Sequence, residues 1–170
     1  VMENRKASRR LSYIFLALII LAGICRFSYG FFVQKEGAHS DETWSFGLAN
    51  SYYDPYIQYS DDTSEYRNVD TWITSDVFRD YLTVQKGERF SFGSVYYNMS
   101  CDTHPPLYFM LLHFLCSFFP GKYMFVIGFI INMAAYTILS IFIYKLLLLI
   151  TKSEAASLIG VLFSTFSLGM

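Results

Sequence analysis

The stretch LSYIFLALIILAGICRFSYGFFV, residues 11–33, decides the fold class. Its 23 positions are apolar except for Arg26 and several small or hydroxyl-bearing residues. A helix of this length rises about 35 Å at 1.5 Å per residue, which is enough to cross a bilayer with some tilt. We therefore predict transmembrane helix 1 over residues 11–33.

A cleaved secretory signal peptide is the alternative reading of this segment. Such a peptide has a shorter apolar core, followed by small residues at the cleavage site. The residues Arg26-Phe27-Ser28-Tyr29 offer no such site, which favours a retained anchor. Four of the ten opening residues are basic, and basic flanks stay in the cytoplasm. We expect residues 1–10 to be a cytoplasmic N-terminus.

Charge is separated from apolar sequence along the rest of the chain. Hydrophobic residues make up 54% and charged residues only 16%, whereas soluble domains carry about 25% charged residues. Residues 34–104 contain twelve acidic and five basic residues, a net charge of −7. A basic flank, an apolar run and then an acidic loop predict that loop 34–104 lies outside the cytoplasm.

Three further apolar segments follow the loop, at 105–119, 123–150 and 155–170. We predict them to be transmembrane helices 2, 3 and 4, which gives an all-α, polytopic integral membrane protein. The last segment is apolar to residue 170 and has no flanking charge. We expect a longer natural protein, of which these residues are an N-terminal part that is inactive alone.

Helical spacing of apolar residues predicts two short juxtamembrane helices within the loop, at 41–51 and 70–84. Asp70 or Thr71 is the expected N-cap of the second. The three cysteines do not suggest a disulfide framework, because Cys25 and Cys116 fall in apolar runs and Cys101 stands alone in the loop. We expect three free thiols.

The first motif that can carry chemistry is His39-Ser40-Asp41-Glu42, just beyond the outer end of helix 1. A carboxylate in a partly dry cleft can act as a general base or bind a divalent cation. The alternative is a structural role, because acidic residues are favourable at the positive end of a helix dipole.

The second motif, Asp102-Thr103-His104-Pro105-Pro106-Leu107-Tyr108, opens the second apolar segment. Prolines are tolerated in a first helical turn, where their missing N–H would be unpaired anyway. Asp102 or Thr103 is the expected cap. Free N–H groups at such an end form an anion site, and a phosphate is the natural anion at this depth. An ordinary helix start is the alternative.

The two motifs together support a shared site more strongly than either does alone, because they lie at the two membrane ends of one external loop. Arg26, near the outer end of helix 1, is a third candidate. Its side chain either extends to the interface or pairs with a lipid phosphate or a loop carboxylate.

An Asp-Glu pair after the first span, a large external loop and an Asp-x-His-Pro-Pro-Leu start to the next span resemble the GT-C class of membrane glycosyltransferases. Asp41-Glu42-Thr43-Trp44-Ser45-Phe46-Gly47-Leu48-Ala49, followed by Tyr52-Tyr53, is similar to the first loop of protein O-mannosyltransferases. The stretch from Gly87-Glu88-Arg89-Phe90 through Val95-Tyr96-Tyr97-Asn98 into the His-Pro-Pro motif looks more like the uncharacterised bacterial branch of the class. The resemblance covers residues 11–150.

The resemblance implies transfer of a sugar from a polyprenyl-phosphate-linked donor to a lipid, glycan or protein acceptor, on the outer face of a bacterial plasma membrane. It implies that Asp41 is the catalytic carboxylate, activating or orienting the acceptor hydroxyl, and that Glu42 supports it or binds acceptor. The candidate substrate-binding residues are Arg26, His39, Asp102, His104 and Pro105. Some members of the class use a divalent cation, so Mg²⁺ or Mn²⁺ is a possible cofactor.

Two other functions remain open at this stage. A transporter would place charged groups along a pathway, and a non-enzymatic assembly subunit would use the loop to bind a partner. The sequence contains no nucleotide-binding glycine loop, no zinc-ligand spacing and no basic nucleic-acid patch.

Overall fold

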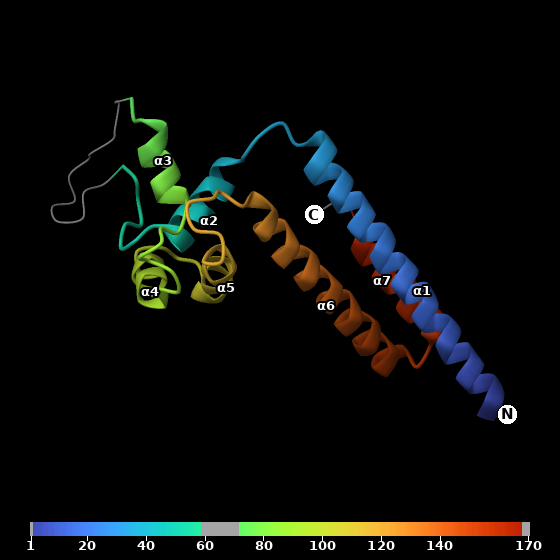
Figure 1. Cartoon of the computed structure of the whole chain (residues 1–170). Helices are drawn as coiled ribbons and strands as arrows, with labels where there is room; N and C mark the ends of the chain where they lie inside the picture. Colours follow the sequence, from blue (N-terminus) through green and yellow to red (C-terminus); the bar gives the residue numbers. More distant parts are fainter. Residues whose placement is uncertain (1, 59–71, 168–170) are drawn as a thin grey trace. The chain divides into compact units, whose positions relative to one another are not determined.

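The computed structural model describes residues 2–58 and 72–167, with side chains from residue 9 onward. These residues form helices and connecting segments, and none of them lies in a β-strand. The chain divides into two compact units, residues 1–36 with 129–170 and residues 37–128. Figure 1 labels the helices along the chain.

The first unit contains α1 (Met2–Tyr29), the π-helical turn η1 (Gly30–Gln34), most of α6 (Phe125–Thr151) and α7 (Glu154–Phe166). Helix α7 packs along α1, as Figure 1 shows. Leu16 and Ile20 of α1 form a buried cluster with Tyr144 of α6 and Val161 of α7. A tight turn at Lys152, with a positive φ of 54°, separates α6 from α7.

Two helices are long and apolar enough to cross a membrane, Arg9–Gln34 and Phe125–Thr151. Most of their large apolar side chains lie on the surface of the unit, including Ile14 at 57% and Leu149 at 75% exposure. Lipid is a suitable solvent for such surfaces, whereas water is not. The two helices agree with the predicted spans at 11–33 and 123–150, and the membrane crossing itself stays a prediction.

The other two predicted spans form shorter helices. Residues 105–119 contain α5 (Pro106–Cys116), and residues 155–170 contain most of α7. Helix α5 has 11 residues and α7 has 13, whereas a span requires about 20. Their helical character is as predicted, and membrane crossing by these two segments stays a prediction.

The second unit is built around α2 (Ser40–Asn50), which contacts α3 (Ser75–Leu82), α4 (Phe92–Ser100) and α5. Phe46, Leu48 and Ala49 of α2 are buried in its core. The predicted loop helix at 41–51 is therefore present within one residue at each end. The predicted helix at 70–84 is shorter, begins after Thr74 and is capped by that residue. Asp70 and Thr71 lie outside the described residues.

Buried hydrogen bonds fasten α4 to the end of α2. The Asn98 side chain is fully buried, and its Nδ2 donates to the carbonyl oxygens of Leu48 at 3.1 Å and Ser51 at 2.9 Å. The hydroxyl of Ser94 donates to the same Ser51 carbonyl at 2.9 Å. These hydrogen bonds hold the end of α2 against α4, and they therefore also set the orientation of the opposite face of α2.

Candidate functional site

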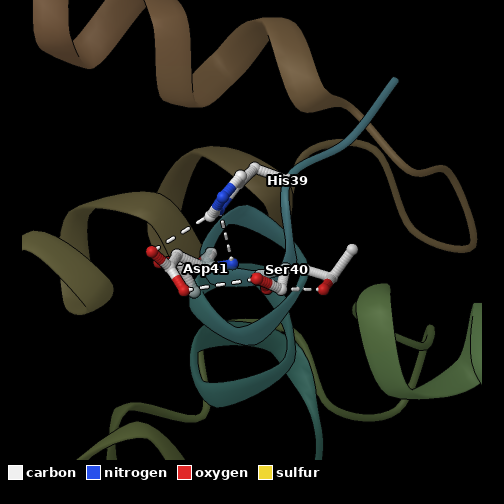
Figure 2. Close-up of polar contacts among 5 residues, drawn as sticks. His39, Ser40 and Asp41 are labelled. Atoms are coloured by element: carbon white, nitrogen blue, oxygen red, sulfur yellow. Dashed lines mark hydrogen bonds and ion pairs between the residues drawn. The ribbon is translucent and has the colours of Figure 1, made fainter. Parts of the chain in front are cut away.

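The chain before α2 holds Asp41 in the first turn of that helix. His39 is the N-cap, and its Nδ1 accepts a hydrogen bond from the Asp41 backbone N–H at 3.2 Å. The Asp41 carboxylate lies 3.5 Å from the same nitrogen and 3.5 Å from the Ser40 hydroxyl (Figure 2). Both side chains are largely exposed, His39 at 74% and Asp41 at 88%. Exposed contacts of this kind add little stability.

The segment before α5 holds Asp102 much more firmly. One carboxylate oxygen accepts the backbone N–H of Thr103 at 2.7 Å, and the other lies 3.0 Å from Nδ1 of His104. The Asp102 side chain is 20% exposed and that of His104 is 67% exposed. Burial opposes ionisation of Asp102, but the hydrogen bonds from His104 and Thr103 outweigh it, and the pKa of Asp102 lies below its ordinary value.

The predicted N-cap of the helix within residues 105–119 is wrong. Pro105, not Asp102 or Thr103, is the N-cap of α5, and Pro106 occupies the first helical position. Asp102 instead closes the turn through Thr103 and His104. The reason is positional: Asp102 lies too far before the first helical turn to reach its N–H groups, whereas the N–H of Thr103 is adjacent.

The two motifs line one open cleft of about 480 Å³. Asp41, Trp44, Ser45 and Leu48 form its α2 side, because residues at this spacing share one face of a helix. The remaining lining residues are Tyr56, Asp102, His104 and Phe109. The cavity therefore contains two carboxylates and an imidazole. In the sequence, about sixty positions separate Asp41 from Asp102 and His104.

Tyr56 is a cleft residue that the sequence did not suggest. Its ring packs edge-on against Trp44 with centroids 5.4 Å apart, and its hydroxyl donates to the carbonyl of Cys101. Burial, and then the negative charge of Asp102, raise the pKa of Tyr56. This tyrosine therefore stays neutral at physiological pH and joins α2 to the segment that carries Asp102.

Four of the predicted site residues do not line the cleft, three of them in the second unit. Glu42 is next to Asp41 but is absent from the cleft lining, and its charge acts on the hydroxyl groups of Tyr108 and Tyr123. His39 serves as a helix cap, and Pro105 as the residue before α5.

Arg26 belongs to the first unit, where the cleft residues are not found. Its Nη1 donates to the carbonyl oxygen of Thr165 at 3.1 Å, and its guanidinium lies 5.9 Å from the ring of Phe166. Thr165 is in the last turn of α7, and a cation there is favourable to the helix dipole. These contacts give Arg26 a structural role between α1 and α7.

The described residues do not supply a metal site. Within 2–58 and 72–167, no group of three or more His, Cys, Asp and Glu side chains is placed to hold an ion. Among these residues the structure shows no ligand set for the Mg²⁺ or Mn²⁺ that the resemblance allows.

The cleft combines proton-accepting groups with aromatic walls. Two carboxylates and a histidine can bind and deprotonate hydroxyl groups, and Trp44, Tyr56 and Phe109 offer apolar surface. A few polar groups among aromatic side chains are typical of small-molecule sites. Comparison of the chain with models of known protein families, with curated proteins and with solved structures finds no match.

Proposed function

We propose that this chain belongs to a membrane glycosyltransferase that moves a sugar from a polyprenyl-phosphate-linked donor to an acceptor on the extracytoplasmic face. One observation carries the proposal: Asp41 from the first motif and Asp102 and His104 from the second line the same cleft. Two unrelated acidic motifs need not line the same cavity. In a transferase they are expected to do so, because donor and acceptor must react in one place.

The lining suits a sugar. Its hydroxyl groups can donate to Asp41 and Asp102, and its less polar ring face can lie on an aromatic wall such as Trp44. In this proposal Asp41 binds and orients the acceptor hydroxyl. Its high exposure leaves both carboxylate oxygens accessible to an incoming group.

The leaving phosphate requires positive stabilisation. Helix α5 begins beside the cleft, with Pro106 at its first position and Phe109 in the cleft wall. Its first turn has no side-chain cap among the described residues, so its N–H groups remain open to a ligand. The positive end of α5 is therefore our proposed contact for the phosphate of the carrier.

The donor lipid places this reaction at a membrane surface. The two long apolar helices, with their exposed leucine and isoleucine side chains, support a membrane location. A cytoplasmic N-terminus and an external loop complete the proposal, on the basis of the basic residues before the first helix and the acidic loop after it. A bacterial plasma membrane follows from the resemblance alone.

Asp41→Asn tests the role of the cleft. In membranes containing the full-length protein, we expect this change to reduce transfer of radiolabelled sugar by about 10²-fold, because the acceptor hydroxyl is no longer held in place. Asp76→Asn is the matched control, because Asp76 is an exposed carboxylate that pairs with Arg79 inside α3. Asp41→Asn with undiminished transfer, at equal membrane abundance, contradicts the proposed role of the cleft.

A further inference from the structure

The second unit contains two pairs of a histidine with a nearby aspartate, and the two rings are held in opposite ways. Nδ1 of His39 accepts a hydrogen bond from the Asp41 backbone N–H at 3.2 Å. An accepting nitrogen carries a lone pair, so the proton of the neutral His39 ring lies on Nε2. The basic nitrogen of His39 is therefore occupied by the helix cap.

His104 has the other arrangement. Its Nδ1 lies 3.0 Å from an oxygen of Asp102, and an ionised carboxylate can only accept. Nδ1 therefore carries the proton, and the lone pair of the neutral ring is on Nε2. The second Asp102 oxygen is held by the Thr103 N–H at 2.7 Å, which fixes the carboxylate and with it the ring.

The lone pair on Nε2 of His104 belongs to a residue that lines the cleft. His104 lines the cavity together with Asp41, and none of the described residues hydrogen-bonds to its Nε2. Imidazole is the side chain that ordinarily changes charge nearest to neutral pH, and this is what a general base working there requires. A carboxylate facing the far side of the ring also stabilises the imidazolium that forms.

We propose that His104 is the general base of the sugar transfer and that Asp102 is a positioning residue which sets its tautomer. This assignment rests on the proposed function of the cleft and deepens it. It gives Asp41 the separate task of orienting the acceptor.

The step balances without a further reactant. Nε2 of His104 takes the proton of the acceptor hydroxyl while the acceptor oxygen forms a bond to the anomeric carbon of the donor sugar. The bond from that carbon to the phosphate oxygen breaks, and the polyprenyl phosphate leaves with the electron pair. The imidazolium, paired with Asp102, then releases its proton to solvent.

The test is the pH dependence of kcat/KM for sugar transfer by the full-length protein in membranes. Besides His104, the ionisable groups that line the cleft are Asp41 on α2, Tyr56 after α2 and Asp102 before α5. We expect the wild-type rate to rise with pH through an acid limb. His104→Gln lowers the rate by about 10²–10⁴-fold and removes this limb.

Two further variants separate catalysis from structure. Asp102→Asn lowers kcat/KM but retains the acid limb, because the ring keeps its basic nitrogen and loses the carboxylate that holds the proton on Nδ1. His39→Gln retains the acid limb at the wild-type pH, whatever the rate of transfer by this variant. Imidazole added to His104→Ala restores part of the transfer, a rescue that a merely structural role of His104 would not show.

The failures of the two proposals are distinguishable. Absence of transfer by the wild type overturns the proposed function. Transfer by the wild type that Asp41→Asn abolishes, together with an unchanged acid limb in His104→Gln, overturns only the role of His104. Circular dichroism of each purified variant in detergent verifies that the helices are intact, and the 67% exposure of the His104 side chain favours that result.

Discussion

Asp41 and Asp102 are the same residue type in two different environments. Asp41 is 88% exposed and contacts only residues of its own turn among those described. Asp102 is 20% exposed and has a hydrogen-bonding partner on each carboxylate oxygen. We therefore expect substitution of Asp41 to affect substrate and substitution of Asp102 to affect both the loop and the His104 ring.

Acid should remove the structural contribution of Asp102. Because its pKa is lower in the folded protein than in the unfolded chain, the ionised side chain stabilises the fold above the unfolded pKa of about 4. That stability is lost as the pH falls through the lower, folded pKa. Thermal unfolding in detergent should show Asp102→Asn less stable than wild type at pH 7, with a difference that shrinks as the pH falls toward 2.

Asp76→Asn is the control for this titration, since its partner Arg79 is in the same exposed helix. A difference between wild type and Asp102→Asn that stays constant from pH 7 to pH 2 would contradict the electrostatic account. It would indicate that the change disturbs packing rather than charge.

Sequence motifs identified part of the cleft and missed the rest for a physical reason. Asp41, Asp102 and His104 belong to local patterns that can be read along the chain. Tyr56 and Phe109 enter the cleft only through tertiary contacts, which no local pattern encodes. Glu42 was predicted beside Asp41 but is not among the residues that line the cavity, because adjacent residues of a helix point about 100° apart.

At the scale of elements, apolar periodicity predicted α2 and α3 and missed α4. The α4 sequence, FGSVYYNMS, is rich in residues with low helix propensity. Its helix depends on Asn98 and Ser94, whose buried hydrogen bonds to the end of α2 have no counterpart in local sequence. Tertiary contacts therefore override propensity at this element.

Close packing of α2 on α3 depends on Gly47. A Cβ at this position would overlap the ring of Tyr81. Tyr81 is 6% exposed and its hydroxyl donates to the Pro55 carbonyl at 3.0 Å, so the ring has little room to move. We expect Gly47→Ala to destabilise the protein by about 1–3 kcal/mol through overpacking, despite the higher helix propensity of alanine.

Thermal or chemical unfolding in detergent measures this effect. Gly87→Ala is the matched control, because a Cβ there meets nothing within 4 Å among the described residues. If the two variants are equally stable, the contact between α2 and the Tyr81 ring is not as tight as the structure has it.

At the scale of the whole molecule, the two long apolar helices were predictable from sequence because each is an apolar run of more than about 20 residues. The extents of α5 and α7 were not, since apolar runs of 11–16 residues suit either a short packed helix or part of a span. Serine and histidine side chains within these helices are buried, among them His113 and Ser157. Both helices therefore pack polar side chains against other parts of the protein, which their apolar content alone does not predict.

The proposed topology makes the three free thiols unequal. Cys101 is exposed in the external loop, Cys116 is buried at 2% exposure, and Cys25 lies within the first long apolar helix. A membrane-impermeant maleimide applied to intact cells should label Cys101 alone. Cys101→Ser should abolish the labelling, whereas labelling of Cys101 only after permeabilisation would contradict the external placement of the loop.

The measurement that tests the central claim most directly is discharge of radiolabelled polyprenyl-phosphate sugars by membranes that contain the full-length protein. The account predicts that the wild type consumes at least one such donor and delivers its sugar to an acceptor, and that Asp41→Asn at equal abundance does not. Failure of the wild type to discharge any donor would contradict the glycosyltransferase and favour a transporter or an assembly subunit.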